Sequence, residues 1–86
     1  MPTVLRWRGR RFYFYSSDGD EPPHVHVDHS GRTIKIWLDT LKVAYNDGYP
    51  MREVTAILGI VDRNRERLLE AWREYFDDRR QNARDR

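Results

Sequence analysis

Hydrophobic and polar residues alternate along the first half of the chain, which is the pattern of strands that bury one face. Turn-forming residues separate the alternating segments, with Gly9 in the first turn and Ser30-Gly31 in the second. This pattern predicts two antiparallel hairpins followed by a further short strand. The predicted strands are residues 3–7, 11–17, 24–29, 32–39 and, where a fifth strand forms, 41–46.

The register of the second hairpin follows from the length of its loop. If the loop has only two residues, the valines of its first strand face the isoleucines of its second strand on the buried side. The other side then carries His24 opposite Trp37 and His26 opposite Lys35. A three-residue loop would set His26 against an isoleucine, so we expect the two-residue loop.

From Met51 onward the apolar residues recur with the period of a helix. We expect either one bent helix over 51–78 or two helices broken near 59–62, where a glycine weakens the pattern. The fold class is therefore α+β, with a small antiparallel sheet of four to five strands packed against a long C-terminal helix or helix pair. Residues 1–78 form one domain, and residues 79–86 are expected to be a disordered tail.

Composition narrows the kinds of protein that this sequence can encode. Its 86 residues suffice for one domain, which buries only about 60% of the surface of the unfolded chain. Because cysteine is absent, disulfides and thiolate zinc sites are excluded, and any metal needs histidine or carboxylate ligands. No apolar run approaches the roughly 20 residues of a membrane helix, and the N-terminal segment lacks the apolar core of a signal peptide. We therefore expect a cytoplasmic protein.

Basic residues are concentrated at the start of the chain. The formal net charge of +2 is too small for a strong nucleic-acid binder, but the first eleven residues hold four arginines and no acid. Arginine makes bidentate contacts with phosphate or carboxylate. The predicted contacts to a nucleic acid or a partner are Arg6, Arg8, Arg10, Arg11, Arg32 and Trp37.

Two histidines stand two positions apart on a predicted strand, so both side chains leave the same face. His24 and His26 can bind one metal ion there, with Asp28 as the candidate carboxylate ligand. Asp28 lies roughly 7 Å beyond His26 along the strand, so a tight site requires a ligand from another strand or a second chain. The alternative is a solvated strand face with histidines packed on a tryptophan. Further candidate ligands are Asp20, Glu21 and His29.

The same histidines are candidate catalysts. An unperturbed imidazole has a pKa near 6.5, so a histidine such as His24 or His26 suits acid and base roles at neutral pH. Lys35 can stabilise phosphorane charge in a small metal-independent ribonuclease. The sequence contains no catalytic triad order, phosphate-binding glycine loop or zinc-protease motif. A role other than catalysis is therefore favoured, and neither a nucleophile nor a cofactor is required, although a divalent metal is compatible with the histidines.

The segments PPHVHVDHSGRTIKIWL (22–38) and REVTAILGIVDRNRERLLEAWREYF (52–76) resemble a family of small bacterial and archaeal proteins known as domain of unknown function 4160. The resemblance runs from about Phe12 to Phe76 and carries a PHVHV signature. It implies a small antiparallel sheet with a C-terminal helix, and it assigns no catalytic residue. Members are often encoded beside another small protein, similar to toxin–antitoxin pairs.

The sequence and the resemblance together predict a cytoplasmic interaction module, a component of a toxin–antitoxin-like or regulatory pair. Its expected partner is a protein, with RNA as a further ligand and no membrane contact. The ribonuclease and the metal-binding interpretations stay open beside it. An exposed strand edge in so small a domain also permits a homodimer.

Overall fold

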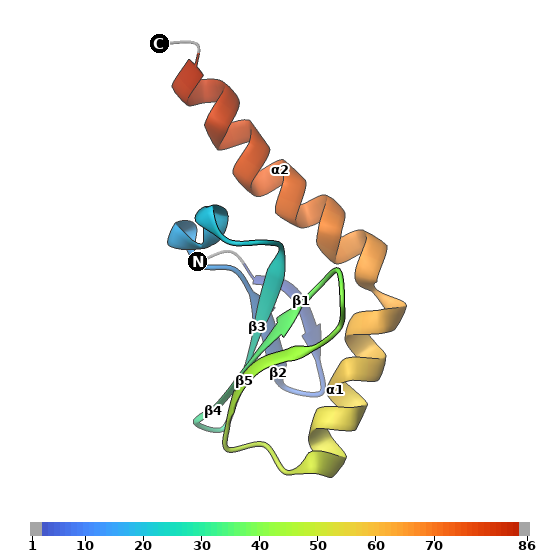
Figure 1. Ribbon diagram of the computed structural model, residues 1–86. Helices are drawn as coiled ribbons and strands as arrows, with labels where there is room; N and C mark the ends of the chain where they lie inside the picture. Colours follow the sequence, from blue (N-terminus) through green and yellow to red (C-terminus); the bar gives the residue numbers. More distant parts are fainter. Residues whose placement is uncertain (1–2, 85–86) are drawn as a thin grey trace.

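The computed structural model describes the backbone of residues 3–84 and the side chains of residues 3–76. Its five antiparallel strands form one open sheet in the order β1-β2-β3-β4-β5, and two helices follow at the C-terminal side (Figure 1). This arrangement confirms the predicted α+β class. The elements are β1 (Thr3–Trp7), β2 (Arg10–Tyr13), the short 3-10 helix η1 (Ser16–Asp20), β3 (His24–His29), β4 (Arg32–Trp37), β5 (Val43–Asp47), α1 (Met51–Arg63) and α2 (Arg65–Arg84).

The β3–β4 hairpin has the predicted register. His24 pairs with Trp37 and His26 pairs with Lys35, across a loop of two residues. Ser30 and Gly31 both have positive φ, 50° and 78°, as the tight turn of a two-residue hairpin requires. The alternation of side chains along β3 therefore decides which residues face the core and which face away from it.

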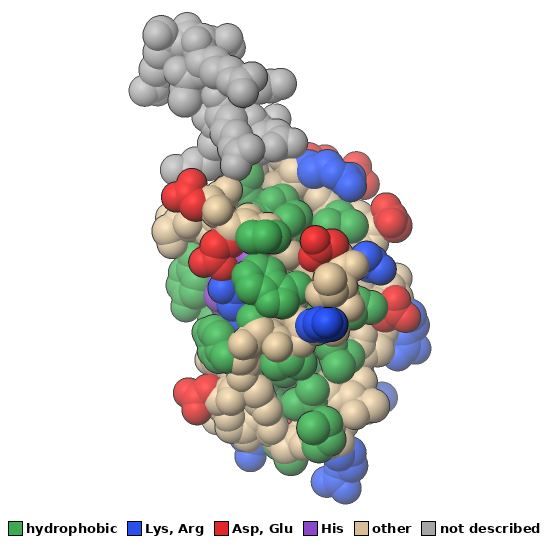
Figure 2. Space-filling view, in the orientation of Figure 1, with side chains coloured by type: hydrophobic (Ala, Val, Ile, Leu, Met, Phe, Trp, Pro, Cys, Tyr) green, Lys and Arg blue, Asp and Glu red, His purple; other side chains and the backbone are tan. Residues whose placement is uncertain are grey.

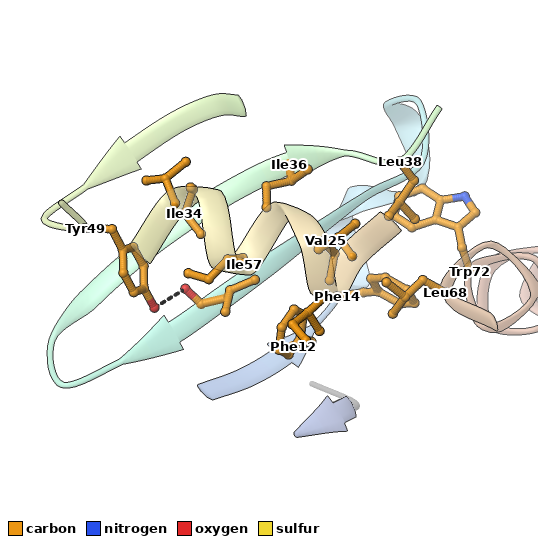
Figure 3. Close-up of a cluster of buried hydrophobic side chains, with 14 of the residues drawn as sticks. Phe12, Phe14, Val25, Ile34, Ile36, Leu38, Tyr49, Ile57, Leu68 and Trp72 are labelled. Atoms are coloured by element: carbon orange, nitrogen blue, oxygen red, sulfur yellow. Dashed lines mark hydrogen bonds between the residues drawn. The ribbon is translucent and has the colours of Figure 1, made fainter. Parts of the chain in front are cut away.

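The core lies between one face of the sheet and the helices (Figure 3). Each central strand contributes alternate side chains to it, and α1 contributes a stripe of aliphatic residues, as the periodicity predicted. Tyr49, in the turn before α1, donates a hydrogen bond from its hydroxyl to the carbonyl of Val27 at 3.0 Å. The fully buried members include Phe12, Phe14, Val25, Val27, Ile34, Ile36, Leu38, Ile57 and Val61.

The helical region is divided at Asn64, so the predicted break near 59–62 is wrong in position. Gly59 remains inside α1, because glycine only lowers helix propensity. Asn64 leaves the helical conformation, with φ −109° and ψ 14°, and its side-chain amide donates to the carbonyl of Ile60 at 2.8 Å. At the division between the two helices, the carbonyl of Ile60 thus accepts from both the side chain and the backbone N–H of Asn64.

The second helix runs on to Arg84, past the predicted end at residue 78. Residues 85–86 and the side chains of 77–86 lie outside the described part of the structure, so the disorder expected for the tail 79–86 stays a prediction. Within the described residues, no helix combines the length and the apolar character needed to cross a membrane.

The segment between β2 and β3 is more ordered than its composition predicted. The strand expected over 11–17 ends at Tyr13, and the chain then forms η1. Gly19 of η1 lies so close to α2 that a Cβ atom there would stand 2.8 Å from the ring of Phe76. The glycine therefore allows η1 to pack against α2, above the end of β3 where the histidines lie.

Candidate functional site

The two histidines of β3 are buried, although they leave the strand on the side opposite the core. His24 has no exposed surface and His26 is 4% exposed, so the expectation of a solvated strand face is wrong. The rings of Tyr13 and Tyr15 lie 5.4 and 4.8 Å from that of His26. The rings of Trp37 and Trp72 lie 5.4 and 5.1 Å from that of His24.

A carboxylate from η1 joins the two imidazoles. Oδ2 of Asp18 lies 3.0 Å from Nε2 of His26 and 3.2 Å from Nε2 of His24. The same oxygen accepts a hydrogen bond from the backbone N–H of Tyr15 at 2.8 Å. One ligand atom from each of the three residues lies within 4.8 Å of the others, so Asp18, His24 and His26, here called the histidine-carboxylate site, could hold a metal ion.

The hydrogen-bond partners fix where the protons of this site lie. Nδ1 of His24 is 2.9 Å from the carbonyl of Pro22, and because a carbonyl only accepts, Nδ1 carries the hydrogen and donates it. In the neutral ring, Nε2 of His24 then points a lone pair toward Asp18, and it has no hydrogen-bond partner among the described residues. His26 can donate from Nε2 to Asp18. The site therefore holds more lone pairs than protons.

Burial sets the acid–base behaviour of His26. It lowers the pKa of this imidazole, and the attraction of Asp18 opposes the shift without reversing it, while the charges of His24 and Lys35 add to the lowering. A neutral imidazole is the form that binds a metal. Burial thus favours, at His26, the neutral form that a metal ligand needs.

Stability is expected to depend on pH through His26. Because the folded-state pKa of His26 lies below its ordinary value of about 6.5, the unfolded chain binds more protons as the pH falls through 6.5. The free energy of unfolding is then fully retained above about pH 6.5 and decreases below it. Urea unfolding at pH values between 7.5 and 5.5, in the presence of a metal chelator, measures how steeply the free energy of unfolding changes with pH. His26→Gln should flatten this dependence and His29→Gln should not, whereas equal slopes in all three proteins would contradict the assignment.

Asp28 lies on the same face of β3 but is not part of the site. Its Oδ1 accepts hydrogen bonds from the hydroxyls of Tyr13 at 3.0 Å and Thr33 at 2.9 Å. The hydroxyl of Tyr13 also lies 3.2 Å from that of Tyr15. Burial, together with the hydrogen bonds to Tyr15 and to Asp28, raises the pKa of Tyr13. The structure therefore gives Asp28 a role in holding neighbouring strands, and it does not bring Asp28 to the two imidazoles.

The other catalytic candidates are similarly engaged. Lys35 stands opposite His26 as predicted, but its ammonium donates to the carboxylate of Glu21 and lies 4.7 Å from the ring centre of Trp37. The hydrogen bond from Lys35 lowers the pKa of Glu21. Because His24 has no exposed surface, a ribonuclease mechanism that uses it would first require η1 to move away, and that interpretation stays a prediction.

The predicted arginine contacts gather around the two hairpin turns. Arg6 and Arg8 are exposed, and the guanidinium of Arg11 lies over the ring of Tyr13 at 4.5 Å. Arg10 and Arg32 are both paired with Glu53, at 3.5 and 3.6 Å. Part of the positive charge at this end of the sheet is thus neutralised from α1.

A second feature of the surface is a set of exposed aromatic and aliphatic side chains on β5 and in the segment that follows β2. Tyr15, Val43 and Tyr45 are 40%, 37% and 48% exposed, and Tyr45 pairs in register with Lys35. Burial raises the pKa of Tyr45, and the charge of Tyr15 adds to the effect. In Figure 2, hydrophobic side chains gather on the visible face among charges of both signs. We call Tyr15, Val43 and Tyr45 the β5 patch.

Sequence reasoning missed Asp18 and the two tyrosines that enclose His26. It named Asp20 and Glu21 from the same acidic segment, which directly precedes the H-x-H strand. That segment was the available signal for a third ligand. The choice among its acids depends on the 3-10 turn of η1, which returns Asp18 over the strand and leaves Asp20 exposed.

An open five-stranded antiparallel sheet with two C-terminal helices and a buried histidine-carboxylate site defines a small α+β domain. The family model of Domain of unknown function (DUF4160) matches residues 9–73, and the chain belongs to this family. The match confirms the resemblance seen in the sequence. Comparisons with curated proteins and with solved structures find no match.

Proposed function

We propose that the protein is an interaction module, one member of a toxin–antitoxin-like or regulatory pair, and that it binds a protein partner through strand β5 and the β5 patch. The observation that carries the proposal is the exposure of β5. All five residues from Val43 to Asp47 are exposed, and β5 is the last strand of the sheet. An edge strand of this kind presents backbone groups that a strand of another chain can pair with.

The side chains of β5 suit a protein partner. The strand carries no lysine, arginine or proline, the residues that commonly protect an edge from pairing. Its exposed tyrosine interacts electrostatically with Tyr15, and tyrosine is enriched at protein interfaces because it offers both an apolar ring and a hydroxyl. A partner that adds a strand here would cover the β5 patch with its own side chains.

The charges near β5 favour a protein over RNA. Lys35 is held by Glu21, and β5 itself contributes one charged residue, Asp47. A nucleic acid requires several free cations against its phosphates, and the arginines lie instead around the hairpin turns, with two of them paired to Glu53.

The test is binding to the protein encoded beside this one. The two proteins should form a complex when they are mixed. Tyr45→Lys should raise the dissociation constant at least about tenfold, which corresponds to a loss of about 1.4 kcal/mol of binding free energy. Met51→Lys is the matched control, because Met51 is 76% exposed but lies at the start of α1. Isothermal titration calorimetry on all three proteins measures the effect.

Three outcomes would overturn this proposal. The first is the absence of any complex, and the second is equal loss of affinity in both variants. The third is salt-dependent retention of RNA that survives Tyr45→Lys and disappears in Arg6→Glu and Arg8→Glu, which would move the interface to the arginines of the hairpin turns. If the protein forms a homodimer and Tyr45→Lys dissociates it, β5 is the binding strand but the partner is a second copy of this chain.

A further inference from the structure

We propose that Asp18, His24 and His26 bind one divalent transition-metal ion, with zinc as the best match. Tyr15 contacts this site and also belongs to the β5 patch, but zinc binding requires no partner, so this proposal does not rest on partner binding. It differs from the site expected from sequence in its carboxylate, which comes from η1 and not from Asp28. Four properties of the site support it.

The first property is the spacing of the ligand atoms. Zinc binds imidazole nitrogen and carboxylate oxygen at about 2.0–2.2 Å, which separates neighbouring ligand atoms in a tetrahedral site by about 3.3 Å. Oδ2 of Asp18 is 3.2 Å from Nε2 of His24 and 3.0 Å from Nε2 of His26. The carboxylate and each imidazole are therefore already separated by nearly the distance that a shared ion needs.

The second property is the surplus of lone pairs. The carbonyl of Pro22 holds the hydrogen of His24 on Nδ1, so that in the neutral ring Nε2 and a carboxylate oxygen face each other without a proton between them. Such a contact is repulsive unless a cation or a proton joins the two atoms. A metal ion would use the lone pair of His24 Nε2 together with the carboxylate, and it would take the place of the proton through which His26 donates to Asp18.

The third property is the support given to the ligands. Histidines that bind metals commonly donate their second nitrogen to a carbonyl or a carboxylate, which fixes the ring and its tautomer. His24 does so toward Pro22 at 2.9 Å. The carboxylate of Asp18 is held in turn by the backbone N–H of Tyr15 at 2.8 Å. The ring of His24 and the carboxylate of Asp18 are thus oriented before any ion binds.

The fourth property is the chemistry of the ligand set. Two imidazoles and one carboxylate suit zinc or ferrous iron, whereas calcium and magnesium prefer oxygen ligands throughout. Zinc accepts three protein ligands together with a water or another small ligand. The surrounding rings of Tyr13, Tyr15, Trp37 and Trp72 reduce the access of water and strengthen the attraction between the ion and the carboxylate.

The experiment measures zinc binding to the full chain after removal of metals with a chelator. We expect one zinc ion per chain by calorimetry, and coincident zinc-induced shifts of the His24 and His26 ring signals by NMR. Asp18→Asn should weaken zinc binding by more than about 100-fold, since loss of an outer partner of a ligand alone costs about 10- to 100-fold. Asp20→Asn is the matched control, because Asp20 ends the same η1 turn and is exposed.

The result is decisive even if a variant fails to fold. The NMR shifts are recorded on the unaltered protein, and His26→Gln gives a second variant that retains a polar side chain. The proposal is overturned if the unaltered protein binds no zinc, if zinc moves the ring signal of His29 in place of those of His24 and His26, or if a folded Asp18→Asn variant binds zinc as tightly as the Asp20→Asn control.

Discussion

Trp72→Ala is expected to lower the free energy of unfolding by about 3–5 kcal/mol, the usual cost of truncating a large buried aromatic residue. Trp72 is 7% exposed and connects α2 to the sheet. Its ring lies 5.2 Å from that of Phe14, 4.2 Å from that of Phe76 and 5.1 Å from that of His24. Its removal would leave a cavity between the helix and the end of β3.

A loss of this size is a large part of the stability of a small domain, which is about 5–10 kcal/mol in total. Urea unfolding followed by circular dichroism measures it. Trp37→Ala is the comparison, because Trp37 also contacts His24, at 5.4 Å, but is only half-buried and lies on β4. A clearly smaller loss is expected there. Equal losses would show that contact with His24, and not the junction of α2 with the sheet, determines the cost.

The strand pairing could be predicted because local rules determine it. Alternation of apolar residues identifies the buried face, and a loop of two residues leaves one register that buries valine against isoleucine. Both conditions hold for the β3–β4 hairpin, so His24 lies opposite Trp37 and His26 opposite Lys35 as expected. The family could be recognised for a related reason, since the matched residues 9–73 include this hairpin.

The burial of the histidines could not be predicted, because it depends on parts of the chain distant from β3. Alternation shows that His24 and His26 point away from the core, but not that η1 and α2 cover them. The covering requires a tight turn at Gly19 against Phe76 and a helix that continues past Asn64. These are tertiary contacts, for which the periodicity of a single segment carries no signal.

The choice of Asp28 as the carboxylate ligand illustrates the same limit. Period-2 geometry correctly places Asp28 on the face of the histidines, but neighbouring strands offer it Tyr13 and Thr33 as hydrogen-bond donors. A carboxylate with two such donors is satisfied where it stands. Asp18, which precedes the strand, is instead returned over the imidazoles by η1.

Asp18→Ala is expected to lower the free energy of unfolding by about 2–3 kcal/mol in metal-free buffer. The substitution removes the acceptor of two hydrogen bonds, from the backbone of Tyr15 at 2.8 Å and from His26 at 3.0 Å. Hydrogen bonds to a charged group contribute about 1.5–3 kcal/mol each. The carboxylate no longer has to be buried, which offsets part of the loss. Urea unfolding measures the change, with Asp20→Ala as the exposed control from the same turn.

The local consequence of Asp18→Ala distinguishes this role from a general loss of packing. The amide of Tyr15 donates to Asp18, and the ring of Tyr15 packs on His26 and belongs to the β5 patch. Hydrogen exchange at the Tyr15 amide should therefore accelerate more than exchange in the centre of β3. Uniform acceleration along the chain would mean that Asp18 contributes only to global stability. Selective acceleration would show that the buried site holds in place a residue of the surface proposed to bind the partner.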